Sequence, residues 1–311
     1  MPVIPQMMRA VRFDEWGDRS VLRVDQVPVP ALAAGHVLVQ VRAAGLNPAE
    51  AMIREGLFDG KDPAKLPSGQ GHDLAGTIVV ADDVTGFAVD DEVIAWSQER
   101  NSHAEYVAVP SAQVVTKPGE LSWEVAGSLP GVAATAWAAM HAVEPRAGET
   151  IAVSAAAGGV GGIVTQMLVA AGVRVLGIVG EDNLDWVRAQ GAEPVLRGEG
   201  LAERLGSAAP EGIDAFIDTF GDEYVRLAAA LGVSPERIET IFGFAAAREV
   251  GAKTEGIAQA ENADVVAEVA RLVAEGTVEL PIAATFSFDE VQSAYEMLEK
   301  RRTRGKIALV P

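Results

Sequence analysis

The stretch that most constrains the fold is Ile151–Gly172, IAVSAAAGGVGGIVTQMLVAAG, near the middle of the 311-residue chain. The short apolar run 151–154 is typical of a buried strand, and the apolar residues after the glycines recur at helical spacing. Gly172 then marks the end of the helix. The glycines between strand and helix leave backbone N–H groups uncovered at a helix N-terminus, where phosphate groups bind well. We therefore predict a dinucleotide-binding loop.

This loop departs from the usual fingerprint G-x-G-x-x-G, because the three positions are Ala156, Gly158 and Gly161. A glycine-rich turn inside an apolar core would look similar, so the loop alone does not decide between the two interpretations. The context favours a dinucleotide site, since a second strand is expected at Val173–Val179 with a helix after it, which completes a βαβ unit. The residues predicted to contact the cofactor in this segment are Ser154, Ala157, Gly158, Gly159, Val160 and Gly161.

Composition and charge exclude several classes of protein. With 49% hydrophobic and 22% charged residues the chain is of ordinary globular type, and no apolar run approaches the roughly 18 residues of a membrane span. The N-terminus has none of the features of an export signal, so we expect a cytoplasmic protein without a membrane partner. The net charge of −19 would repel a nucleic acid backbone. Because the chain has no cysteine, redox chemistry must come from a bound cofactor.

Two regions of the chain differ in their predicted secondary structure. Up to about Val109, short strands separated by Gly, Pro and Asp predict a compact, partly open β-barrel, with one short helix that begins at Asn47-Pro48. From Ser122 the pattern is helical, and after Pro145 strands alternate with helices, which indicates a doubly wound parallel sheet. Strands of that sheet are expected at Thr150–Ser154, Val173–Val179, Pro194–Leu196, Ile213–Ile217, Arg237–Ile241 and Thr277–Ile282, followed by a helix at Phe288–Glu299 and a strand at Lys306–Val310.

Several segments in the same order along the chain resemble one family, the zinc-free (zeta-crystallin-like) quinone oxidoreductases of the medium-chain dehydrogenase/reductase superfamily. The resemblance implies an α/β protein with a GroES-like catalytic domain at 1–121 and 284–311, and a Rossmann NADP(H)-binding domain at 122–283. It also implies NADPH-dependent reduction of a quinone or similar electrophilic small molecule, in a homodimer. The segments are AAGLNPAE (43–50), GHDLAGTIV (71–79), FAVDDEVIA (87–95), GVAATAW (131–137), SAAAGGVGG (154–162) and RGKIALV (304–310).

A catalytic zinc is not expected. His72 falls where zinc-dependent relatives carry a histidine ligand, but their cysteine ligand is missing from this chain. A catalytic zinc needs three protein ligands and an open position, so we interpret His72 as a hydrogen-bonded residue beside the cleft. Without a Lewis acid to ionise an alcohol, alcohol oxidation is disfavoured.

The resemblance assigns Asn47 and Thr135 to the reaction centre, both near the nicotinamide. An Asn-Pro turn and a threonine that caps a helix are the alternative interpretations. Where relatives often carry tyrosines in the substrate pocket, this chain has Met52 and Phe58. Neither side chain donates a proton, which favours a flat quinone over an enone that needs protonation at carbon. Ordinary burial in the core is the alternative for both residues.

The preference between NADPH and NADH is less constrained. The second strand ends at Val179 instead of the acidic residue typical of NAD-binding folds, which leaves room for a 2′-phosphate. However, Leu184 replaces a basic residue of many relatives, and Glu181 and Asp182 would oppose a phosphate. NADPH is predicted on the resemblance, and NADH stays open. The expected contacts are Gly180 and Asn183, with Arg188 or Arg197 as more distant charges or surface residues, and Phe242 and Gly243 near the nicotinamide amide.

Two further functions stay open. An enoyl or alkene reductase of the same superfamily would share the fold and cofactor but would need a proton source. None of the three tyrosines, Tyr106, Tyr224 and Tyr295, falls on the expected pocket helix, so water would have to serve. A nucleotide-binding sensor or scaffold without turnover is the other alternative.

Overall fold

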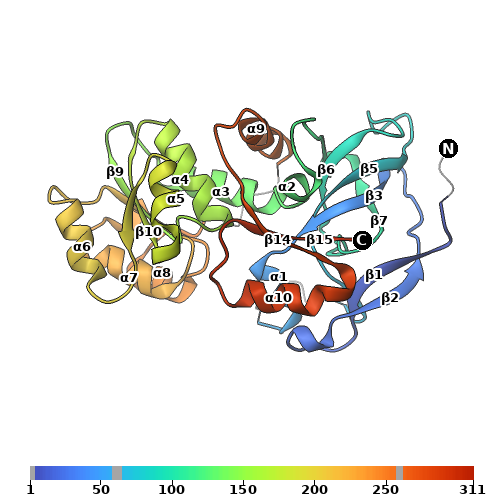
Figure 1. The fold of residues 1–311 in the computed structure, drawn as a ribbon, viewed down its shortest axis with the longest axis horizontal. Coiled ribbons are helices and arrows are strands. Elements are labelled where there is room, and N and C mark those ends of the chain that lie inside the picture. Colours follow the sequence, from blue (N-terminus) through green and yellow to red (C-terminus); the bar gives the residue numbers. More distant parts are fainter. Residues whose placement is uncertain (1–3, 58–64, 257–261) are drawn as a thin grey trace. The chain divides into compact units, whose positions relative to one another are not determined.

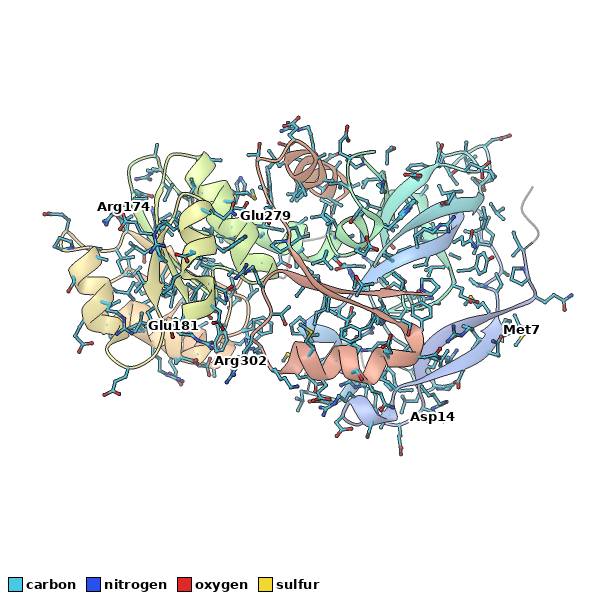
Figure 2. The ribbon with its side chains drawn as sticks, viewed as in Figure 1. Met7, Asp14, Arg174, Glu181, Glu279 and Arg302 are labelled. Carbon is cyan, nitrogen blue, oxygen red and sulfur yellow. The ribbon has the colours of Figure 1, made fainter. Side chains whose placement is uncertain are left out.

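The computed structural model describes residues 4–57, 65–256 and 262–311 (Figure 1). These residues form two compact units, each with its own apolar core. Charged side chains such as Asp14, Arg174, Glu181 and Arg302 are exposed on the surface of their units (Figure 2). The first unit takes its residues from 1–131, 266–274 and 281–311, and the second from 132–265 and 275–280.

The first unit is built around a long strand, β3 (His36–Gly45). Its residues Val37, Val39 and Val41 are almost completely buried, because this face of the strand packs on the core. The described strands leave the sheet open, which confirms the partly open β arrangement predicted from the sequence. β3 pairs with β5 (Asp73–Val80), β7 (Tyr106–Pro110) and β15 (Lys306–Val310); β5 continues to β6 (Glu92–Trp96) and β8 (Val114–Thr116), and β15 to β14 (Ile282–Ser287). A separate sheet joins β1 (Met7–Phe13), β2 (Arg23–Pro28) and β4 (Ser68–Gly69).

A second apolar cluster of this unit joins segments from both ends of the chain. Phe13 of β1 and Leu46 after β3 are buried together with Tyr295, which lies on the late helix α10 (Val291–Glu299). The short helix α1 (Pro48–Arg54) begins directly after Asn47, as predicted. The remaining helices in or adjoining the unit are α2 (Trp123–Gly127), α3 (Pro130–Ala142), which runs on into the second unit, and α9 (Ala263–Ala274).

The second unit contains the doubly wound sheet that the sequence predicts. Its five parallel strands lie in the order β11-β10-β9-β12-β13, so the strand order reverses between β9 and β12. Buried residues of α6, α7 and α8 join one core cluster on a single face of this sheet. The strands are β9 (Thr150–Ser154), β10 (Arg174–Val179), β11 (Glu193–Leu196), β12 (Ala215–Asp218) and β13 (Ile238–Thr240), and the helices are α4 (Gly159–Ala170), α5 (Leu184–Ala189), α6 (Leu201–Ala208), α7 (Asp222–Ala230) and α8 (Phe244–Val250).

The predicted sixth strand of this sheet, Thr277–Ile282, is wrong. Residues 277–281 form no strand, and the next strand, β14, pairs with β15 of the first unit. The backbone of Glu279 is instead satisfied by one side chain on α4: its N–H donates to Gln166 Oε1 at 2.7 Å, and its carbonyl accepts from Gln166 Nε2 at 2.9 Å. A side-chain amide thus takes the place of the neighbouring strand.

None of the helices in the described residues has both the length and the apolar character needed to cross a bilayer.

Candidate active site

The loop between β9 and α4 has the geometry of a phosphate-binding turn. Gly158 is the N-cap of α4, and the first helical hydrogen bond runs from Gly162 N to Gly158 O at 2.8 Å. The N–H groups of residues 159–161 therefore have no helical carbonyl to bind. They lie at the positive end of the helix dipole, which attracts anionic groups.

Gly161 is required by this close packing. A Cβ at this position would lie 2.3 Å from the carbonyl oxygen of Ala155, and a Cβ at Gly158 would lie 3.2 Å from the same oxygen. Any side chain at position 161 would push the helix off the turn. The residues present thus fit a pyrophosphate, which needs bare backbone at close range. Gly158, Gly159 and Val160 are partly exposed, whereas Ala157 is buried.

Ser154 and Asp218 tie this loop to the ends of the neighbouring strands. Ser154 is fully buried, and its hydroxyl donates to Asp218 Oδ1 at 2.6 Å and accepts from Thr219 N at 2.8 Å. Thr240 Oγ1 donates to Asp218 Oδ2 at 2.7 Å. Burial raises the pKa of Asp218, against the effect of these hydrogen bonds. The Ser154 hydroxyl therefore links the loop after β9 to the loop after β12.

The segment Phe242–Gly243, which is predicted to lie near the nicotinamide, is held by Thr240, whose hydroxyl also donates to Asp218. Thr240 Oγ1 accepts hydrogen bonds from the N–H groups of Phe242 and Gly243, at 3.2 and 2.7 Å. A Cβ at Gly243 would lie 2.7 Å from a methyl group of Val225, so a side chain at this position would require its neighbours to shift. Asp218 thereby organises the carboxyl ends of β9, β12 and β13, where ligands bind in open α/β sheets.

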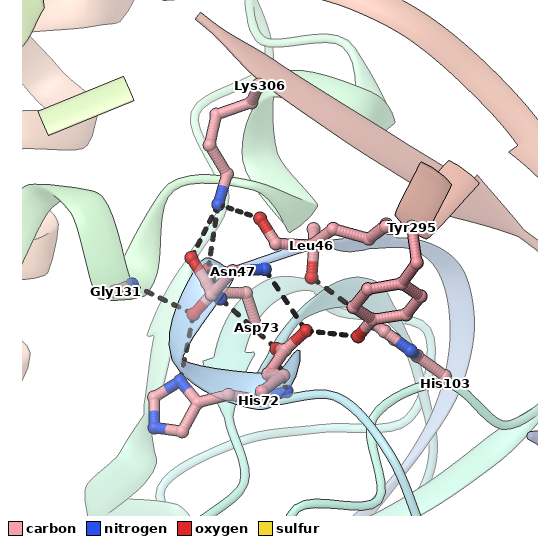
Figure 3. A network of polar contacts seen from close by, with 10 residues as sticks. Leu46, Asn47, His72, Asp73, His103, Gly131, Tyr295 and Lys306 are labelled. Atoms are coloured by element: carbon pink, nitrogen blue, oxygen red, sulfur yellow. Dashed lines mark hydrogen bonds and ion pairs between the residues drawn. The ribbon is translucent and has the colours of Figure 1, made fainter. Parts of the chain in front are cut away.

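In the first unit, Asn47 lies in a buried polar network (Figure 3). Its Nδ2 donates to Asp73 Oδ2 at 2.9 Å and to Glu50 Oε1 at 3.3 Å, and its Oδ1 accepts from Lys306 Nζ at 2.6 Å. Because an ammonium group only donates, Lys306 fixes the orientation of the amide. Both amide protons of Asn47 are used within the unit.

Asp73 is the charge around which this network forms. It is fully buried and accepts from Gly131 N at 2.8 Å, while His72 Nδ1 lies 2.9 Å from its Oδ1. Burial alone would raise the pKa of Asp73, but the hydrogen bond with His72 and the charge of Lys306 outweigh it and lower the pKa to about 2. Burial lowers the pKa of Lys306, while the charges of Asp73 and Glu50 oppose that effect.

A second branch of the network passes through Glu50 to the helix α10. Tyr295 is completely buried and donates its hydroxyl to Glu50 Oε2 at 2.6 Å. Burial and the charge of Glu50 raise the pKa of Tyr295 well above its ordinary value. Gln70 Nε2 donates to the same hydroxyl at 2.7 Å. Tyr295 therefore stabilises the unit and is not available to protonate a substrate.

The structure also places two of the other predicted site residues, Met52 and Thr135. Met52 is partly buried on α1, and Thr135 is partly buried on α3 within the second unit. Phe58 lies outside the described residues. In the part of the chain that the structure describes, no group of three or more His, Asp or Glu side chains is arranged to hold a metal ion.

Sequence reasoning missed Glu50, Lys306 and Asp218. Glu50 carried a usable signal, because Asn47-x-x-Glu50 is a helix-start pattern, and the Glu50 carboxylate does accept from Asn47 N at 3.1 Å. Asp218 ends the apolar run AFID, directly before a loop. The sequence offers no signal that Lys306 belongs to the site, since a lysine at the start of a strand is usually solvated.

Two protein-family models match parts of the chain. Residues 33–119 match the family described as an alcohol dehydrogenase GroES-like domain, and residues 190–309 match the family described as a zinc-binding dehydrogenase. The quinone oxidoreductase of Rattus norvegicus is 34% identical over 225 residues, 70% of this chain and 68% of that protein. The chloroplastic NADPH-dependent alkenal/one oxidoreductase of Arabidopsis thaliana is 29% identical over 327 residues, 99% of this chain and 81% of that protein.

The fold has the same relatives. The solved structure of the quinone oxidoreductase from Coxiella burnetii superposes with a TM-score of 0.88 at 26% identity, covering 98% of this chain and 99% of that one. A GroES-like unit and a five-stranded Rossmann sheet with a glycine-rich phosphate loop define a medium-chain dehydrogenase/reductase. Within that superfamily, the chain belongs to the zeta-crystallin-like quinone oxidoreductase family.

Proposed function

We propose that this protein is an NADPH-dependent oxidoreductase that reduces a quinone or a similar electrophilic small molecule without zinc. The observation that carries the proposal is the loop at the N-terminus of α4, where Gly161 leaves no room for a side chain and residues 159–161 offer free N–H groups. NADPH would supply the hydride. Membership of the quinone oxidoreductase family supports the same reading.

The cofactor-binding residues follow from this arrangement. We propose that the N–H groups of Gly159, Val160 and Gly161 bind the pyrophosphate, with Ala157 and Gly158 shaping the turn. Gly180 and Asn183 would contact the adenosine ribose, because they follow the second strand of the βαβ unit. Phe242 and Gly243 would hold the nicotinamide amide through their backbone, which Thr240 fixes.

At the reaction centre, we propose that Asn47 orients the reactants through the lone pair that remains on its Oδ1. Lys306 uses the other lone pair, and both amide protons are engaged. Asn47 is thus suited to accept a hydrogen bond, and Thr135 would assist beside the nicotinamide. Met52 and Phe58 would line an apolar substrate slot. Holding two flat rings in contact is the main contribution a protein makes to such a transfer.

Reduction of an activated alkene is the second candidate. It is supported by relatives named for such substrates, among them the 2-methylene-furan-3-one reductase of Solanum lycopersicum, 28% identical over 99% of this chain and 80% of that protein. In this case water would protonate the product carbon, since Met52 has no proton to give and Tyr295 is buried. A sensor or scaffold that binds NADPH without turnover is the third candidate.

One assay separates the three candidates. NADPH oxidation is followed through the loss of absorbance of the reduced nicotinamide ring, with a panel of quinones and a panel of enones. The proposal expects rapid oxidation with quinones. Oxidation with enones alone would favour the alkene reductase, and no oxidation in the presence of measurable NADPH binding would favour the sensor.

We also propose that the protein acts as a homodimer in the cytoplasm, and that its catalytic domain comprises 1–121 and 284–311 and its cofactor domain 122–283. The support for these assignments is the family resemblance and the sequence pattern. Analytical ultracentrifugation tests the dimer, and a monomer at micromolar concentration would contradict it.

A further inference from the structure

Arg197 lies beside the proposed ribose site. A Cβ built on Gly180 would be 3.4 Å from Arg197 Nε and 3.7 Å from one terminal nitrogen of the same guanidinium. Arg197 follows β11, and Gly180 follows β10, so the contact joins the ends of two neighbouring parallel strands. Because position 180 has no side chain, the guanidinium lies directly against the backbone just beyond the second strand of the βαβ unit.

The backbone that carries Arg197 is fixed on both sides. Its N–H donates to the carbonyl of Val179 at 2.8 Å, which extends the pairing of β10 with β11 by one residue. Arg204 of α6 binds the rest of the loop: Nε donates to Leu196 O at 2.9 Å, and the two terminal nitrogens donate to Glu199 O at 2.8 Å and Gly198 O at 3.3 Å. Arg204 thus fixes the conformation of the loop, and with it the position of the Arg197 backbone.

The guanidinium of Arg197 is exposed and forms no ion pair within the described residues. Arg188, the other candidate charge in this region, is paired with Asp185 on the same helix. Glu181, after Gly180, is also exposed (Figure 2) and would repel a phosphate or bind ribose hydroxyls. Charges of both signs therefore lie near the end of β10. Within the described residues, the side-chain atoms nearest to a Cβ at Gly180 belong to Arg197.

We propose that Arg197 binds the 2′-phosphate of NADPH and gives the protein its preference for NADPH over NADH. This inference rests on the proposed function. A guanidinium binds phosphate through two parallel charge-assisted hydrogen bonds, which a lysine cannot reproduce. Val179 leaves the space that an acidic residue fills in NAD-specific folds, and Arg197 supplies the charge from the next strand. Arg204 is the positioning residue of this subsite.

The test uses fragments of the cofactor, so it does not depend on turnover. The affinities of the full-length protein for adenosine 2′,5′-bisphosphate and for 5′-AMP are measured by isothermal titration calorimetry. Arg197→Gln should weaken binding of the bisphosphate by about 10-fold or more and leave 5′-AMP unchanged, since one charge-assisted contact is lost. Arg197→Lys should lie between the two. Arg188→Gln is the matched control and should change neither affinity.

The outcomes separate this inference from the proposed function. If the wild-type protein binds both fragments equally, or if Arg197→Gln leaves their ratio unchanged, the assignment of Arg197 is overturned while the dinucleotide site stands. A loss of the preference in Arg188→Gln instead would assign the subsite to α5 and likewise overturn it. If the wild-type protein binds neither fragment nor NADPH, the proposed function fails as well.

Discussion

Lys306 and Asp73 are buried charges whose free energies depend on each other. Lys306 Nζ donates to Leu46 O and Asn47 Oδ1, both at 2.6 Å, and lies 3.7 Å from Asp73 Oδ2. Removing one member of such a group leaves the other charge buried without compensation. The network is therefore stable as a whole and sensitive to the loss of any one charge.

Replacing Lys306 should reveal this dependence. Lys306→Met is expected to lower the free energy of unfolding by about 3–5 kcal/mol, because Asp73 is left without its counter-charge. The double variant Lys306→Met/Asp73→Asn should recover part of that loss. Urea denaturation measures all three proteins. Lys300→Met, which removes an exposed lysine paired with Glu296, is the control and should cost less than about 1 kcal/mol.

Asn47 connects this stability to the proposed reaction. Asn47→Ala is expected to lower kcat by on the order of 10²-fold through misplaced reactants, while the dissociation constant for NADPH stays the same. Stopped-flow turnover and fluorescence titration of NADPH give the two quantities. An unchanged kcat would remove Asn47 from the reaction centre and leave it a purely structural role.

Glu239 should make the stability of the second unit depend on pH. It is buried on β13 and accepts from Gly256 N at 2.8 Å and Glu255 N at 3.1 Å, and its burial raises the pKa to about 7. The folded protein holds this proton where the unfolded chain, with a pKa of 4.5, has lost it. The stabilisation is thus complete below about pH 4.5 and disappears as the pH rises through 7.

The expected size of this effect is on the order of 3 kcal/mol between about pH 4.5 and pH 8. Glu239→Gln should flatten the decline, because a neutral amide does not titrate. The free energy of unfolding is measured across this pH range for both proteins. Identical pH dependence in the two proteins would show that other groups cause the decline.

Among the elements, the turn from β9 to α4 was the most predictable. Glycine spacing, the apolar strand and the helical period all lie within about 20 residues, so local rules sufficed. The helix start at Asn47 and that at Ser122, whose hydroxyl accepts from Val125 N at 3.3 Å, were readable for the same reason.

Elements and contacts that depend on residues far apart in the sequence could not be predicted from the sequence pattern. The apolar run at 277–282 resembles a strand, but Gln166 satisfies the backbone of Glu279 there, and the two residues are 113 positions apart. Likewise, Lys306 lies 259 positions from Asn47, and Arg197 reaches Gly180 only because β10 and β11 are neighbours. Sequence pattern places such residues on elements, while tertiary packing decides what they contact.

The phosphate turn itself can be tested by substitution. Gly161→Ala is expected to abolish measurable NADPH binding, because the new Cβ would lie 2.3 Å from Ala155 O. Gly206→Ala is the matched control, since a Cβ at this position of α6 meets nothing within 4 Å. It should keep NADPH binding and gain up to about 1 kcal/mol of stability from the better helix former. Normal binding by Gly161→Ala would disprove the pyrophosphate assignment.

Binding of NADPH should stabilise the whole protein and slow hydrogen exchange in particular segments. Saturation at roughly 100 times the dissociation constant should stabilise the protein by about 2.7 kcal/mol. Hydrogen exchange should slow most in residues 155–162, 180–183, 196–199 and 219–221, and least in the pairing of β1 with β2. Mass spectrometry of peptic fragments locates the change. Protection confined to the first unit would contradict the proposed site.

The contact between Lys306 and Asn47 also has a consequence for how the protein is made. Synthesis of the first 131 residues produces β3, α1 and Asp73. The ammonium group of Lys306, which compensates the charge of Asp73, and the strand β15, which pairs with the end of β3, are translated only much later. Until then a newly made chain carries an uncompensated carboxylate in a half-built sheet with an open edge. Such edges recruit other strands, so ribosome-bound chains of this protein should depend on chaperones until β15 emerges.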